Sequence, residues 1–219
     1  MFELDEAKLR RAAEEVRYLL NRGYNRESVL KFVADHHHLD KVHRTILMRS
    51  VFSSGEIEER RRKTVSFKDL NGETLSVDGY NVLIVIETMM RNGLLIEGDD
   101  GYIRDMSGVH GKYRATNLTA EALSIILEKL ESANPKKVLI FFDKPVSKSG
   151  ELAKATRQLM KEHRIEGDSL TVRRADSTVL KAGGVALTSD SVILQKARKC
   201  FDIAGHIVKE RGYRKILKL

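Results

Sequence analysis

Four aspartates each follow a short apolar run in the last two-thirds of the chain. Asp78 ends the run at 74–77, Asp143 ends 138–142, Asp190 follows 185–189, and Asp176 lies shortly past 170–172. Such runs are typical of strands buried in a parallel sheet, and ligands bind beyond the carboxyl ends of those strands. Four carboxylates gathered there would repel one another unless a divalent cation with oxygen ligands neutralised them. The spacing therefore predicts a metal-dependent phosphodiesterase site.

The residues beside two of these aspartates suit the same chemistry. Asp78 is followed by Gly79, which permits a tight turn into a helix, and by Asn81, which can hydrogen-bond within the loop or orient Asp78. Ser189 precedes Asp190 and, with the N-terminus of the next helix, favours an anionic ligand. Mg²⁺ or Mn²⁺ held by the four carboxylates would orient a water and offset the charge on a phosphate.

The charge of the chain favours a polyanionic partner. Its formal net charge is +8 and its pI is about 9.5, and residues 196–219 hold eight basic against two acidic side chains. A solvated helix face with a basic tail is the alternative explanation. The candidate contacts to an RNA backbone are Lys144, Arg173, Arg174, Lys196, Arg198, Lys199, Arg211, Arg214 and Lys215. Lys144 either pairs with the neighbouring Asp143 or holds the scissile phosphate.

These candidate residues depend on an α/β fold to bring them together. Strands alternating with helices from residue 73 onward predict a parallel sheet with helices on both faces. The predicted elements are strands at 73–78, 138–143, 169–174 and 185–188, helices at 82–92, 118–132, 149–164, 191–200 and 202–211, a hairpin-like stretch at 94–106 with a tight turn, and a last short strand at 216–219.

The first quarter of the chain follows a different pattern. Apolar residues recur at helical spacing up to about residue 52, which predicts three short amphipathic helices. We therefore expect a helical domain at 1–55, a charged linker or exposed helix at 56–70, and the α/β domain at 71–219. The basic run Arg60–Lys63 is expected on a solvated face.

The motifs of the α/β domain resemble the NYN branch of the PIN-like nucleases. The resemblance covers residues 72–200 and is carried by Asp-Gly-Tyr-Asn after a strand, a Phe-Asp strand end, Ala-Asp, and Thr-Ser-Asp before a helix containing Gln195. It implies a PIN-like fold in which Asp78, Asp143, Asp176 and Asp190 bind metal and cleave RNA, with Asn81 and Ser189 in support. The segments 17–24 and 50–53 resemble a largely archaeal family named for domain of unknown function 434, which implies no activity.

Other chemistry receives less support. His36, His37 and His38 with His43 suggest a transition-metal cluster, but consecutive histidines on a helix point in different directions, so no zinc site is expected. Cys200 has no partner cysteine and is expected to be a small buried side chain. No glycine-rich phosphate-binding motif follows a strand.

RNA is the expected partner, and whether the chain forms a homodimer is left open. With no membrane-spanning run, no signal peptide and one cysteine, we expect a cytoplasmic protein. The alternative to a ribonuclease is a catalytically inactive RNA-binding or ribosome-associated module with the same fold. A metal-dependent phosphatase acting on a small substrate is a third hypothesis, although it gives the basic tail no use.

Overall fold

The computed structural model describes residues 4–106 and 113–219 and begins with the three predicted helices. Asp5, Asn25 and Asp40 each accept a backbone hydrogen bond from the first turn of the helix that follows, so each helix begins at a polar cap. The helices pack around a shared apolar core that includes Leu9 and Ile46. Their bounds are α1 Glu6–Leu20, α2 Arg26–His36 and α3 Lys41–Ser50.

A fourth helix occupies most of the segment for which a linker or an exposed helix was expected. Helix α4 (Ser54–Lys63) begins with a capping box between Ser53 and Glu56, and a short 3-10 helix, η1 (Phe67–Leu70), follows. The basic run at its end is not wholly solvated, because Arg60 is buried. The expectation of a solvated face is therefore wrong for Arg60.

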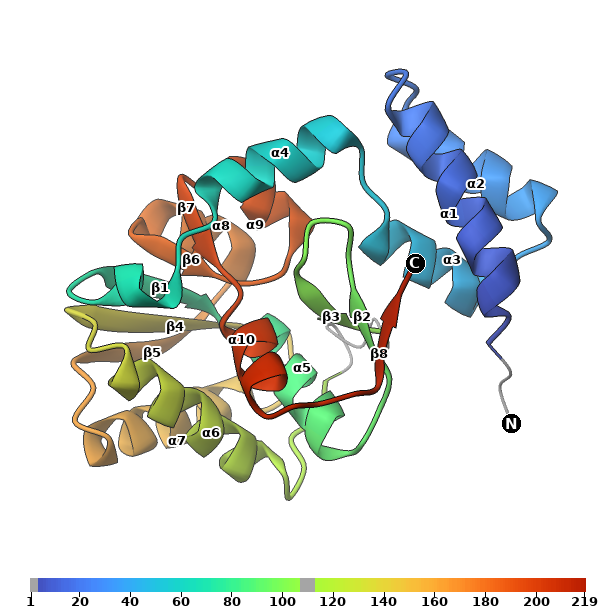
Figure 1. The fold of residues 1–219 in the computed structure, drawn as a ribbon. Coiled ribbons are helices and arrows are strands. Elements are labelled where there is room, and N and C mark those ends of the chain that lie inside the picture. Colours follow the sequence, from blue (N-terminus) through green and yellow to red (C-terminus); the bar gives the residue numbers. More distant parts are fainter. Residues whose placement is uncertain (1–3, 107–112) are drawn as a thin grey trace.

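The centre of the molecule is a five-stranded parallel sheet, as the alternating pattern predicted. The strand order is β5-β4-β1-β6-β7, so β1 lies in the middle, and the chain builds outwards to β4 and β5 before it returns to add β6 and β7 (Figure 1). The strands are β1 Thr74–Asp78, β4 Lys137–Asp143, β5 Gly167–Val172, β6 Val185–Leu187 and β7 Lys199–Phe201.

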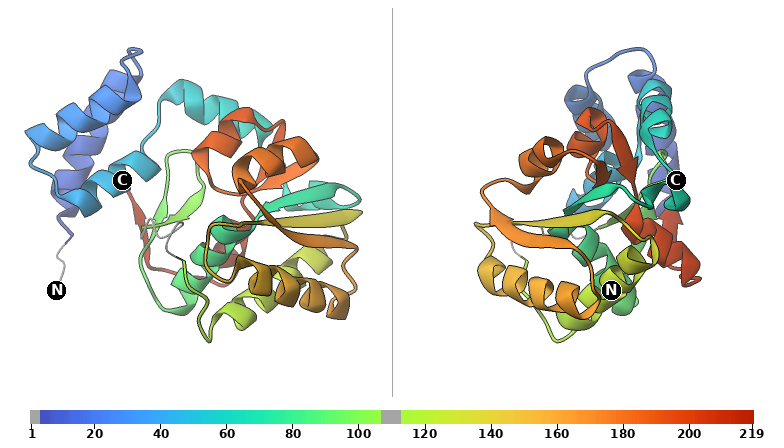
Figure 2. Two further views of the ribbon diagram at one scale, coloured as in Figure 1. Left: turned by 180° about the vertical axis from the view of Figure 1, so that it is seen from behind. Right: turned by 90° about the vertical axis from the view of Figure 1, so that its left-hand side faces the viewer.

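Helices cover both faces of this sheet (Figure 2). One face carries the larger core, and the other is covered by α8 and α9 and bordered by α4. None of the helices in the described ranges combines the length and apolar character that a membrane crossing requires. The helices over the larger core are α5 Gly79–Met90, α6 Thr119–Ser132, α7 Ser149–Glu162 and α10 Ile203–Glu210, and those on the other face are α8 Ala175–Ala182 and α9 Ser191–Lys196.

A second, three-stranded sheet joins the helical region to the α/β region. Strands β2 (Leu95–Glu97) and β3 (Ile103–Asp105) form the predicted hairpin, and β8 (Ile216–Lys218) pairs in parallel with β2. Ile96 and Leu217 belong to the same apolar core as the first three helices. The last strand predicted from the sequence is confirmed, and it completes the helical region rather than the central sheet.

The predictions were wrong for two short elements. Helix α8 was missed, and the helix expected at 191–200 ends at Lys196, after which Cys200 lies in strand β7. Short segments carry too few apolar repeats for the sequence to separate helix from strand. Gly184, after α8, has φ +72°, and a Cβ atom there would lie 2.0 Å from the backbone oxygen of Thr74, so this turn requires glycine.

Candidate active site

Three neighbouring strands end at one edge of the sheet with the predicted polar residues. Asp78 is the last residue of β1 and pairs in register with Phe141, two residues before Asp143 at the end of β4. On the other side of β1, Leu187 ends β6, and Asp190 lies three residues beyond it. Because β1 is the strand where the chain changes direction across the sheet, this edge is where an α/β fold binds ligands.

Thr188 and Asn81 connect the ends of β1 and β6. The buried Asp78 accepts a hydrogen bond from Thr188 Oγ1 at 3.2 Å. Asn81 Oδ1 accepts from Ser189 N at 2.7 Å and from Ser189 Oγ at 3.1 Å, and also lies 3.2 Å from Thr188 Oγ1. Asn81 therefore fixes the loop that carries Asp190.

Asp190 and Asp143 both accept hydrogen bonds from the start of a helix. Asp190 caps α9, where its Oδ1 accepts from Val192 N at 2.9 Å and from Ile193 N at 3.1 Å. Asp143 Oδ1 accepts from Ala175 N at 2.9 Å and so anchors the start of α8 at the end of β4. Both carboxylates are thus oriented by backbone groups.

Tyr80, the second residue of α5, keeps its hydroxyl proton at neutral pH. Burial, and after it the negative charge of Asp143, raises the pKa of the Tyr80 hydroxyl to about 12. Its ring packs against Phe142.

Asp176 is placed differently from the other three aspartates. It is exposed in the first turn of α8, where its Oδ1 accepts from Ser177 N. Among the described residues, only Glu15, His36 and His37 bring three potential ligand atoms within 4.8 Å of one another, so the four aspartates do not form such a group. Their all-oxygen donor set nevertheless suits Mg²⁺, which keeps several waters and needs only one or two carboxylates.

Two further acids, Glu87 and Asp105, are buried. Glu87 accepts hydrogen bonds from Tyr113 Oη and Thr119 Oγ1, both at 2.6 Å, and pairs with Arg91. Asp105, at the end of β3, pairs with Arg49 at 2.6 Å. Neither is a solvated surface acid, and Asp105 borders the cavity described next.

A cavity of about 200 Å³ lies beside Asp190 and is completed by the helical region. Its walls come from α2, α3 and the segment after α3 on one side, and from β3, α5 and the loop after β6 on the other. The lining residues are Arg26, Met48, Arg49, Phe52, Asn81, Arg104, Asp105, Ser189, Asp190 and Ser191. The N-terminal helices therefore form part of the candidate active site.

Three arginines of this cavity were not identified from the sequence. Arg49 Nη1 donates to Asp105, Arg104 Nε donates to the Ser189 carbonyl at 2.9 Å, and Arg26 Nη2 donates to the Met48 carbonyl at 2.8 Å. Burial lowers the pKa of Arg26, but a guanidinium stays protonated over the physiological range. No sequence motif links these positions, since the fold alone brings them together.

The basic residues that were predicted to contact RNA lie in different parts of the structure. Lys144, Arg173 and Arg174 follow β4 and β5 and are exposed at the carboxyl edge of the sheet. Lys199 begins β7, which places it at the opposite edge, where it pairs with Glu73. The others are exposed near the ends of α9 and α10 and before β8 and are Lys196, Arg198, Arg211, Arg214 and Lys215.

Comparison with known proteins gives two family matches. The family described as a domain of unknown function (DUF5616) matches residues 67–206, and the family described as a protein of unknown function (DUF434) matches residues 8–63. The uncharacterized protein MJ0935 of Methanocaldococcus jannaschii is 41% identical over 187 residues, which cover 85% of this chain and 89% of the relative. No solved structure matches the chain. The alignment with this relative extends over both the helical and the α/β regions.

Proposed function

This chain belongs to the family described as a domain of unknown function (DUF5616), and we propose that it is a PIN-like, NYN-type ribonuclease that depends on Mg²⁺ or Mn²⁺. One observation carries the proposal. Asp190 shares a cavity with Arg26 and Arg49 at the strand edge where α/β folds bind ligands. Phosphodiester hydrolysis needs both kinds of group, carboxylates for a metal ion and cations for a phosphate.

In this proposal the residues at the sheet edge have different roles. Asp78, with Asp143 or Asp190, would hold Mg²⁺ or Mn²⁺, which supplies positive charge beside the scissile phosphate when bound. Thr188 and Asn81 orient these carboxylates and the loop between them through the hydrogen bonds described above. Asp176, exposed in α8, would join the site through solvent or substrate rather than as a buried ligand.

The arginines on the other wall of the cavity would position the RNA backbone. Guanidinium groups bind phosphate oxygens in a planar, bidentate manner, and such contacts fix a substrate without reading its sequence. Arg26 and Arg49 come from the helical region, so in this proposal that region is a substrate-binding wall. Lys144, Arg173 and Arg174 would extend the same positive surface along the carboxyl edge.

The test combines metal binding with RNA cleavage in one buffer. Titration calorimetry with Mn²⁺ and cleavage of a labelled mixed RNA pool are measured for the wild type, Asp78→Asn and Asp190→Asn. We expect both metal binding and cleavage to be lost in the variants. The control is Asp168→Asn, the same change at the start of β5 and therefore at the opposite edge of the sheet, which should retain both. Cleavage that survives in both active-site variants would refute the proposal.

A catalytically inactive RNA-binding module is the second candidate. The observation in its favour is that no three of the four aspartates bring ligand atoms within 4.8 Å of one another in the described chain. The same experiment separates the two candidates, because the module predicts RNA affinity with neither Mn²⁺ binding nor cleavage. Both predict that the logarithm of RNA affinity falls linearly with the logarithm of salt concentration.

A further inference from the structure

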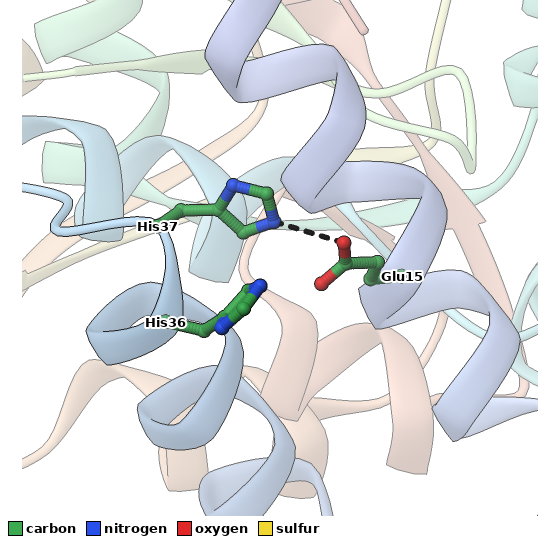
Figure 3. Close-up of side chains that lie close together, drawn as sticks. All are labelled: Glu15, His36 and His37. Carbon is green, nitrogen blue, oxygen red and sulfur yellow. Dashed lines mark ion pairs between the residues drawn. The ribbon is translucent and has the colours of Figure 1, made fainter.

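Three side chains with metal-binding atoms meet in the helical region, far from the sheet edge. Glu15 comes from α1, His36 is the last residue of α2, and His37 follows it directly. Figure 3 shows the two imidazole rings and the carboxylate turned toward a common space between the helices. One potential ligand atom from each residue lies within 4.8 Å of the other two.

The contact between His37 and Glu15 brings two ligand atoms together without a hydrogen bond. His37 Nε2 lies 3.0 Å from Glu15 Oε1, which is an ion-pair distance. The nitrogen is nevertheless buried and has no hydrogen bond of acceptable geometry. A buried polar atom usually has a hydrogen-bond partner, so this nitrogen is available to bind a metal ion.

The imidazole rings of His36 and His37 lie side by side although the two residues are adjacent in the sequence. Adjacent side chains within a helix point about 100° apart, which is why the sequence favoured no metal site here. His37 is the C-cap residue just after the end of α2, and His38 after it has φ 48°. The planes of the His36 and His37 rings meet at 84°, with centroids 5.0 Å apart. The two rings therefore meet edge to face and do not diverge.

Phe32 and the end of the helix hold His36 in place. The Phe32 ring stacks on the imidazole one turn later in α2. His36 also lies at the C-terminus of the helix, where the aligned peptide dipoles favour a positive charge. A cation at this point would be stabilised by the helix as well as by its ligands.

We propose that Glu15, His36 and His37 form a binding site for a divalent transition metal ion, and that Zn²⁺ is the ion it prefers. Two imidazoles and one carboxylate are a donor set that suits Zn²⁺, whereas Mg²⁺ prefers oxygen ligands alone. Three protein ligands leave a fourth position for water. The ion would join the middle of α1 to the end of α2, so its binding free energy would stabilise the helical region.

The experiment uses the untagged full chain after removal of metal with a chelator. Zn²⁺ and Mg²⁺ are titrated separately by calorimetry into the wild type and into Glu15→Gln, His36→Asn and His37→Asn. We expect Zn²⁺ to bind the wild type in preference to Mg²⁺, and each substitution to weaken Zn²⁺ binding by at least about tenfold. Because the Glu15 side chain is 45% exposed, Glu15→Gln keeps α1 intact, and circular dichroism checks each variant.

The matched control is His163→Asn. His163 makes an ion pair with Glu131 at 2.9 Å, much like that of His37 with Glu15, but no third ligand joins it among the described residues. Zn²⁺ affinity should be unchanged in this variant. Equal Zn²⁺ binding by the wild type and a Glu15→Gln/His36→Asn/His37→Asn variant, or no binding by the wild type, would overturn the proposal. RNA cleavage is not measured, so the outcome is independent of the proposed ribonuclease.

Discussion

The acidic side chains of the hairpin turn and those of the sheet edge are bound by different groups. At the turn between β2 and β3, Asp100 accepts hydrogen bonds from Arg60 and twice from Arg104, and Asp99 is bound by both Nε and Nη2 of Arg17. At the sheet edge, by contrast, Asp190 accepts from the backbone N–H groups of α9. The turn binds its acids with charged donors, whereas Asp190 is bound by neutral ones.

This difference indicates which acids hold the fold together and which are available for chemistry. An arginine that bonds to both oxygens of a carboxylate compensates its charge, so Asp99 and Asp100 fasten α1 and α4 to the hairpin. A backbone N–H orients a carboxylate without supplying a full opposite charge, so Asp190 can still attract a cation. The partner of an acid is thus more informative than its burial, since Asp100 is the more buried of the two.

Replacing the most buried acid of the turn should have the largest effect. Asp100→Asn leaves two buried guanidinium groups without their anion, and we expect the free energy of unfolding to fall by about 3–5 kcal/mol. Chemical denaturation measures the loss. The control, the exposed Asp176→Asn, should change stability by less than about 0.5 kcal/mol. A loss for Asp100→Asn that is no larger than this control would break the comparison.

The lowered pKa of Asp100 predicts how the stability of the protein depends on pH. Burial alone would raise the pKa of Asp100, but the hydrogen bonds and charges of Arg104 and Arg60 outweigh it, and the pKa is lowered. Because the folded pKa lies below the unfolded one, this contribution to stability is present at neutral pH and is lost as pH falls through the folded value. Denaturation midpoints measured down to acidic pH should therefore fall more steeply in the wild type than in Asp100→Asn.

At the sheet edge, the corresponding substitution should affect activity rather than stability. Asn is as good a helix cap as Asp, so Asp190→Asn should keep α9 and leave the unfolding free energy nearly unchanged. RNA cleavage should fall by about a hundredfold to a thousandfold, the range for removal of one charge-stabilising group. Cleavage rates measure the expected loss of activity, and thermal melts measure the expected unchanged stability. A large loss of stability with unchanged cleavage would place Asp190 with the structural acids of the turn.

A smaller effect is expected where the two regions meet at the cavity. Arg26→Gln removes a cation from the cavity wall while preserving a polar side chain, and we expect RNA binding to weaken by about tenfold, as for the loss of one charged hydrogen bond. Fluorescence anisotropy with a labelled RNA measures this affinity. The control is Arg22→Gln, whose guanidinium packs on Tyr18 outside the cavity and should bind RNA as the wild type does.

The smallest effects concern the exposed basic side chains. Each phosphate contact removed should reduce the slope of log affinity against log salt by about one. Lys144→Ala, at the carboxyl edge, should show this change, whereas Lys199→Ala, at the opposite edge and paired with Glu73, should not. Equal slopes for the two variants would show that RNA does not follow the edge occupied by Asp190.

The central sheet could be predicted from the sequence, but the cavity could not. Buried parallel strands leave continuous apolar runs, so the strands ending at Asp78 and Asp143 are readable locally. Arg26, Arg49 and Arg104 belong to three separate elements, and nothing in their local sequence marks them as neighbours of Asp190. Their meeting depends on how the helical region docks, which is a long-range property of the fold.

The same limit explains the errors at individual residues. Arg60 looked solvated because it stands in a charged run, yet the helix buries it against Asp100 and the Phe52 ring. His36 and His37 looked divergent from their adjacent positions, yet the centroids of their rings lie 5.0 Å apart. In each case the deciding contact lies outside the local pattern that was used.

The pairing of β8 with β2 has a consequence for folding during synthesis. Leu217 and Leu219 pack with the first three helices, and Arg17 of α1 donates to the Leu219 carbonyl at 3.0 Å. The ribosome makes the N-terminal helices first, but their apolar core lacks these side chains until residues 216–219 have been made. The helical region therefore cannot complete its packing before residues 216–219 have been made, and until then a nascent chain would expose part of that core to chaperones.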